Sequence, residues 1–190
     1  MNPASLYTYF ESLDELFTAM ILESYSGLAG TLETALDRAP SGATAPADGD
    51  GGSASEPGGS EPTIEPLVAV VRAYRQWAVE HPAHYNLIFT DQIPGYAAPP
   101  GGPTVEAELA VLRPLISAFG LAVRGEPYGV EDYDKAPPDD VARFLHAWGV
   151  LHGLVSLEIN HHLPFVDEPE QLVIDATVRS ATVTGRFGWG

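Results

Sequence analysis

Residues 140–160 constrain the fold of this 190-residue chain more than any other segment, because they are apolar on nearly every side. Apolar residues recur there at spacings of three and four, the period of an α-helix. A helix that is apolar all round must be covered on both sides. In a chain of this size we expect one face to meet the chain's own core and another to meet a partner subunit. The residues of the two apolar stripes are Val141, Phe144, Leu145, Trp148, Leu151, Val155 and Ile159, and Val150, Leu154 and Leu157.

Helical periodicity also predicts the rest of the chain, and no alternating polar and apolar run is long enough to predict a sheet. Ser12 and Glu15 have the spacing of a capping box, which predicts a helix start at residue 13. Thr104 is the expected cap of a later helix. We therefore expect an all-α bundle of six or seven helices. The expected helices cover residues 4–9, 13–38, 64–81, 84–90, 105–123, 140–160 and 168–184.

One long segment separates the first helices from the others. Residues 40–62 contain six Gly, four Pro and four Ser, and no Val, Ile, Leu, Met or aromatic residue. Such a segment cannot bury enough apolar surface to offset the entropy lost on ordering it. We expect a flexible acidic loop over 39–63, a Pro/Gly-rich segment over 91–103 and a third loop over 124–139. This divides the chain into residues 1–11, a connecting helix over 12–38, the loop, and a domain over 64–185.

Charge and composition exclude several classes of function. With 26 acidic and 9 basic residues, the chain has a formal charge of −17, which opposes attraction of its whole surface to nucleic acid. The absence of cysteine excludes disulfides and cysteine-bound metals. No 18-residue apolar run predicts a membrane helix, and no signal peptide is evident. We expect a cytoplasmic protein without membrane contact.

Two motifs resemble the TetR-type transcriptional repressors. Ser5-Leu6-Tyr7-Thr8-Tyr9-Phe10, followed by Ser12-Leu13-Asp14-Glu15-Leu16-Phe17, is similar to the end of their helix-turn-helix and the start of the next helix. Trp148-Gly149-Val150-Leu151-His152-Gly153 resembles the Trp-His-Gly signature of one class of their C-terminal regulatory domain, and residues 74–89 are similar to the same class. The resemblance implies a TetR-like helical bundle that dimerises, binds a small effector and represses transcription.

The resemblance also implies which residues contact DNA. Residues 1–11 match the recognition helix, and the family positions that contact bases or phosphates fall on Asn2, Ser5 and Tyr7. The family carries two further helices before this point, so we expect a remnant of the helix-turn-helix domain here. Operator DNA is therefore an expected partner only where those helices are present.

Two further sets of residues follow from the resemblance and the helical pattern. The expected effector is apolar or aromatic, and its pocket residues are Trp77, His84, Tyr85, Phe89, Phe144, Trp148 and His152. Aromatic residues at helical spacing also suit an ordinary core. The last two helices are expected to form a four-helix bundle with a second copy of the chain. The interface residues are Val150, Gly153, Leu154, Leu157, Val178 and Ala181.

Two other functions stay open at this point. One is an all-α metal-binding or enzymatic bundle, which would use His161 and His162 with Glu158 or Asp167. Adjacent histidines point in different directions on a helix, and no nucleophile motif or phosphate-binding glycine loop is present, so we expect no metal, no cofactor and no enzyme. The other is a truncated paralogue that acts only by pairing with full-length regulators.

Overall fold

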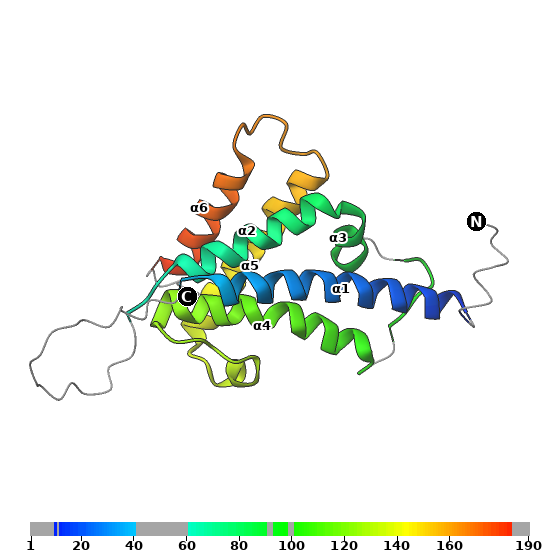
Figure 1. Ribbon diagram of the computed structural model, residues 1–190, viewed down its shortest axis with the longest axis horizontal. Coiled ribbons are helices and arrows are strands. Elements are labelled where there is room, and N and C mark those ends of the chain that lie inside the picture. The colour runs from blue at the N-terminus through cyan, green and yellow to red at the C-terminus, as the bar shows by residue number, and fades with distance from the viewer. Residues whose placement is uncertain (1–9, 11, 41–60, 91–92, 99–100, 184–190) are drawn as a thin grey trace, which may run out of the picture.

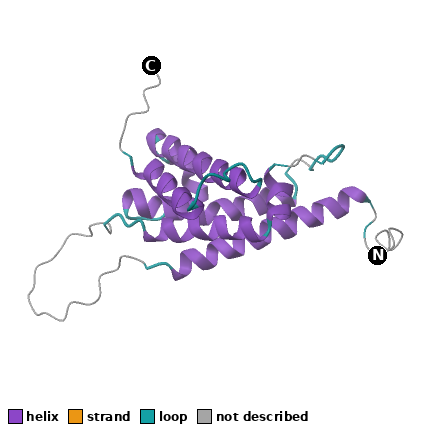
Figure 2. Cartoon of the chain, turned by 90° about the horizontal axis from the view of Figure 1, so that it is seen from above, coloured by secondary structure: helices purple, strands orange, loops and turns teal. Residues whose placement is uncertain are grey.

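The computed structural model describes residues 10, 12–40, 61–90, 93–98 and 101–183. Every regular element in these ranges is helical, which confirms the all-α class for the part described (Figure 2). The short 3-10 helix falls within residues 124–139, where we expected only a loop. The elements are α1 (Leu13–Arg38), α2 (Glu65–Glu80), α3 (Pro82–Phe89), α4 (Pro103–Arg124), η2 (Val130–Lys135), α5 (Pro138–Ile159) and α6 (Pro169–Thr182).

Local sequence signals fix where these helices begin. The Ser12 hydroxyl accepts a hydrogen bond from the Glu15 backbone N–H at 3.1 Å, which confirms Ser12 as the N-cap of α1. The helices α3 to α6 each begin with proline, whose missing N–H costs nothing in the first turn. Thr104 is not the cap of α4, contrary to our expectation. Gly102 holds that position, and Thr104 is buried in the first turn behind Pro103.

The helix α2 lies at the centre of the bundle. It contacts all five other α-helices. In Figure 1, α1 and α4 run side by side along one side of the molecule, and α5 and α6 lie on the other, joined by the loop after Ile159. Because both flanks of α2 are covered, Val70, Val71, Tyr74 and Ala78 are completely buried.

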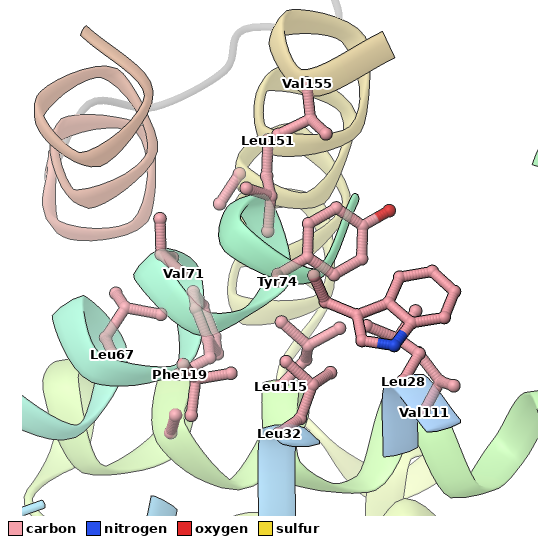
Figure 3. Packing of buried hydrophobic residues seen from close by; sticks show 14 of the residues in the cluster. Leu28, Leu32, Leu67, Val71, Tyr74, Val111, Leu115, Phe119, Leu151 and Val155 are labelled. Atoms are coloured by element: carbon pink, nitrogen blue, oxygen red, sulfur yellow. The ribbon is translucent and has the colours of Figure 1, made fainter. Parts of the chain in front are cut away.

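Aliphatic side chains from four helices fill the space around α2. Figure 3 shows Leu28 of α1, Val71 of α2, Leu115 of α4 and Leu151 of α5 converging on this region, with Tyr74 beside them. Each of these residues is at most 3% exposed. Burying one such side chain contributes about 1.5–3 kcal/mol, so the core holds α1, α2, α4 and α5 in one unit.

An ion-pair group ties α2 to the C-terminal pair of helices. Arg75 Nε donates to Glu158 Oε2 of α5 at 2.8 Å, and its Nη1 lies 3.4 Å from Glu170 Oε2 of α6. The Arg75 and Glu158 side chains are only 15% and 14% exposed, so solvent screens this pair less than an ordinary surface pair. Glu158 is therefore held by Arg75, although it was considered as a metal ligand with His161 and His162.

A buried carboxylate fixes the start of α5. Asp140 is 2% exposed and accepts hydrogen bonds from Arg124 Nε and the Tyr128 hydroxyl, both at 2.6 Å. Arg143, one turn further along α5, also donates to it. Burial alone would raise the pKa of Asp140, but the hydrogen bonds from Tyr128 and Arg124 and the charges of Arg124 and Arg143 outweigh it and lower that pKa. These contacts hold the end of α4 and the segment after it against the first turn of α5.

We expect Asp140→Asn to lower the free energy of unfolding at pH 7 by about 2 kcal/mol, because it removes the charged acceptor that Arg124, Tyr128 and Arg143 share. A carboxyl whose folded pKa is lowered stabilises the fold above its unfolded pKa of about 3.9. That contribution is lost as the pH falls through the lower folded pKa. Urea unfolding at several pH values should therefore show the two proteins converging toward acid pH, and a constant difference would contradict this account.

Candidate functional site

Five rings from three helices form an aromatic cluster, which we define as Tyr74 of α2, Tyr85 and Phe89 of α3, and Trp148 and His152 of α5. The ring centres of Tyr74 and Trp148 lie 5.5 Å apart at 73°, an edge-to-face contact. His152 stacks between two rings, 5.6 Å from Tyr85 and 5.8 Å from Trp148. Phe89 meets His152 edge-on at 5.1 Å. Such arrangements follow the ring quadrupoles and add to the apolar burial.

The polar atoms of the aromatic cluster bond to one another. The Tyr74 hydroxyl donates to the Tyr85 hydroxyl at 3.1 Å. Tyr85 Oη lies 2.9 Å from His152 Nδ1 and donates to the His152 carbonyl oxygen at 3.2 Å. Tyr74 and Tyr85 are completely buried, so these bonds satisfy hydroxyl groups that would otherwise be costly inside the protein.

Burial disfavours the charged form of all three polar groups. It raises the pKa of Tyr74 well above its ordinary value, and the neighbouring Tyr85 adds to the effect. Burial also raises the pKa of Tyr85 and lowers the pKa of His152. The cluster is therefore an apolar, aromatic environment with a few neutral polar atoms, the composition typical of small-molecule sites.

The seven expected pocket residues fall into three groups. Tyr85, Phe89, Trp148 and His152 lie together in the aromatic cluster. Trp77 and His84 lie apart from it, because Trp77 stacks on His81 at 5.1 Å and approaches His84 at 6.5 Å. Phe144 packs against Phe119 of α4 at 5.5 Å. Sequence analysis missed Tyr74, whose only signal is a hydroxyl on the apolar face of a helix.

A narrow cavity begins where the aromatic cluster ends. Its volume is about 10 Å³, which suffices for about one water molecule. Two expected pocket residues, Phe144 and Trp148, are in its wall. The lining residues are Leu67, Val71, Leu115, Phe119, Phe144, Ala147, Trp148, Leu151 and Thr177, from α2, α4, α5 and α6.

Other parts of the described structure are less suited to hold a ligand. An open hollow of about 560 Å³ lies on α1 over small residues such as Gly27 and Gly30, and it lacks the enclosure of a ligand site. Within the described ranges, no three His, Asp or Glu side chains come together as a metal site. Among the same residues, no helix is both long and apolar enough to cross a bilayer.

A family model described as "Tetracyclin repressor-like, C-terminal domain" matches residues 67–180, from α2 to α6. The chain belongs to this TetR family. The resemblance of its C-terminal part is thereby confirmed. The aromatic cluster and the narrow cavity both lie inside the matched TetR domain.

Named relatives and a solved structure extend the comparison. Rv1816 and MT1864 of Mycobacterium tuberculosis and Mb1846 of Mycobacterium bovis are named HTH-type transcriptional regulators. Each is 31% identical over 142 residues, which make up 75% of this chain and 49% of the relative. The chain thus spans about half the length of the curated relatives it matches. The crystal structure of SCO4313, named as a regulatory protein, matches 95% of this chain and 79% of its own with a TM-score of 0.64 and 26% identity.

The DNA contacts expected from the TetR resemblance, Asn2, Ser5 and Tyr7, lie outside the described residues.

The expected dimer residues of α5 and α6 are among the described residues. Leu157 is 42% exposed, and Val150, Gly153, Leu154 and Val178 are partly exposed. Ala181 is completely buried in its own chain, so it offers no surface to a partner. It faces the core because it follows the buried Thr177 by one helical turn.

The lowered pKa of His152 has a consequence for acid stability. Between its folded pKa and its unfolded pKa of about 6.5, the unfolded chain binds more protons, so stability falls as the pH falls. We expect His152→Gln to make stability less dependent on pH in this window, although the loss of ring packing makes it less stable at pH 8. Urea unfolding of both proteins between pH 8 and 5.5 measures this. Equal pH slopes would show that His152 does not stay neutral in the folded protein.

Proposed function

We propose that this chain senses a small apolar or aromatic effector and dimerises as part of a TetR-type transcriptional regulator. It acts by binding and not by catalysis. Family membership and the names of the relatives support regulation of transcription. The observation that carries the proposal is the position of α3, which contributes two rings to the aromatic cluster and also packs against α1.

The helix α3 is short and contacts both neighbours. Its residues Tyr85 and Phe89 belong to the aromatic cluster. On the α1 side, Tyr25 meets Phe89 edge-on at 6.1 Å and donates a hydrogen bond to the Ile88 carbonyl oxygen at 3.3 Å. A molecule that displaces the rings of the cluster therefore displaces α3 against α1. In the family, the helix corresponding to α1 follows the DNA-reading helix.

A second contact joins the segment after α3 to the beginning of α1. The Tyr96 hydroxyl lies 2.9 Å from Thr18 Oγ1, and the Tyr96 ring meets Phe17 at 6.1 Å. Thr18 is in the second turn of α1, close to its N-terminal end. Both contacts support coupling between effector and DNA reader, which requires only a difference in effector affinity between two positions of α1.

The outer face of α5 supports dimerisation. Residues 144–157 contain no Asp, Glu, Lys or Arg, although the chain carries a charge of −17. Leu145 and Leu157 on this helix are 56% and 42% exposed. A Cβ built on Gly149 or Gly153 would meet no atom within 4 Å, so neither glycine is required by packing inside the chain. We assign this uncharged strip, with the adjoining part of α6, to a second copy of the chain.

We expect sedimentation analysis to show a dimer at micromolar concentration. Leu157→Glu should produce monomers, because it places a charge in the apolar contact. Val105→Glu is the matched control: Val105 is 47% exposed, similar to Leu157, but lies in the first turn of α4. A monomeric wild type, or dimers of Leu157→Glu as stable as those of the control, would contradict the assignment.

The regulatory function itself is tested in the cells that make the protein. Chromatin immunoprecipitation of the native product should enrich discrete genomic sites. Leu157→Glu should lose them, because a dimer is needed to hold two recognition helices about 34–36 Å apart on successive major grooves. Val105→Glu should retain them. If the wild type is dimeric and enriches no site, the chain is not part of a DNA-binding regulator.

A further inference from the structure

The narrow cavity contains one buried polar atom without a partner. Thr177 of α6 is 2% exposed, and its Oγ1 makes no hydrogen bond in the structure. The other eight lining residues contribute apolar side chains, apart from the indole N–H of Trp148. Figure 3 shows part of this wall, with Leu67 and Val71 of α2, Leu115 and Phe119 of α4, and Leu151 of α5 around a common space.

The missing hydrogen bond of Thr177 sets it apart from four other threonines in the described helices. A helical threonine ordinarily has a local partner, the carbonyl oxygen four residues earlier. Thr177 Oγ1 does not bond the carbonyl oxygen of Val173, which is the residue four positions earlier. The threonines that use it, at 2.7–2.9 Å, are Thr18, Thr31, Thr34 and Thr182.

Neither burial alone nor a trapped water accounts well for this hydroxyl. A buried hydroxyl without a partner destabilises the fold, and native proteins contain few of them. A trapped water usually has two to four polar partners, and the side chains of this wall offer two at most, Thr177 Oγ1 and the indole N–H of Trp148. The arrangement instead suits a guest that carries one polar atom on an otherwise apolar body.

One residue of the cavity wall is partly exposed to solvent. This residue is Trp148; the other eight lining residues are at most 6% exposed. Trp148 belongs to the aromatic cluster as well, where it contacts Tyr74, Phe89 and His152. Movement of its ring would widen the cavity and disturb the cluster in the same step.

We propose that Thr177 is the polar contact for the effector, which is a small, mainly aromatic molecule with a single hydroxyl-like group. The narrow cavity of about 10 Å³ is too small for such a molecule as it stands, so binding requires the Trp148 ring to move. The aromatic body then lies between α2, α4 and α5, and its polar group bonds Thr177 Oγ1. This inference rests on the proposed function, because it names the effector class of the same sensing domain. The hydrogen bond to Thr177 favours molecules with a polar group over purely apolar ones, and movement of the Trp148 ring opens the cavity to them.

The test uses phenol and toluene, which have nearly the same shape and differ by a hydroxyl in place of a methyl group. Their affinities are measured by titration calorimetry on the full chain, on Thr177→Val and on Thr182→Val. Thr182 is the matched control, an exposed threonine on α6 that bonds its own helix. We expect the ratio of phenol to toluene affinity to fall about five- to tenfold in Thr177→Val. The ratio should be unchanged in Thr182→Val.

Thermal unfolding without ligand gives an independent readout. Thr177→Val keeps the shape of the side chain and removes the unpaired hydroxyl, so its melting temperature should rise by about 2–6 °C. A lower melting temperature would show that the hydroxyl is bonded within the protein, which overturns the inference. An unchanged ratio of phenol to toluene affinity in Thr177→Val would overturn the role of Thr177, but it would not contradict effector binding in this cavity. Failure of the wild type to bind either probe would overturn both.

Discussion

The enclosure of α2 by the five other helices is the constraint on which the rest of the structure depends. The residues that α2 turns toward its neighbours, among them Val70, Val71, Tyr74 and Ala78, have no access to water, so each must be apolar or find a partner inside the protein. Tyr74 is the polar exception. Its ring fills space beside Leu151, and its hydroxyl finds Tyr85, which in turn meets His152. The hydrogen-bonded aromatic cluster is therefore a consequence of placing a tyrosine on a central helix.

The helices themselves could be predicted from local signals. Ser12, the prolines that open four helices, and the periodic apolar residues define the elements to within a few residues. The exception is Thr104. Although threonine is a good capping residue, α4 begins earlier, with Gly102 as its N-cap and Pro103 as its first residue. Proline at the first helical position requires an extended residue before it, and Gly102 supplies that conformation.

The composition of the candidate site could be predicted only in part. Residues four apart on one helix share a face, so Tyr85 pairs with Phe89, and Trp148 with His152. Helical spacing does not say how a helix is rotated against its neighbours. Tyr74 faces α5, whereas Trp77, one turn later, packs on α1, where a Cβ on Gly27 would lie 3.4 Å from its indole nitrogen. Thr177 had no sequence signal, because a missing partner is visible only once every neighbour is placed.

The uncharged strip on α5 also affects how two chains approach each other, because the whole chain has a formal charge of −17. Two such chains repel each other at a distance, and the repulsion opposes contact through acidic surfaces. In the proposed dimer, contact through the strip brings no carboxylates from residues 144–157 together, so this part of the contact adds no repulsion. The acidic surface would disfavour approaches that bring carboxylates together. Added salt would strengthen such a dimer, because it screens the repulsion and weakens no ion pair within the strip.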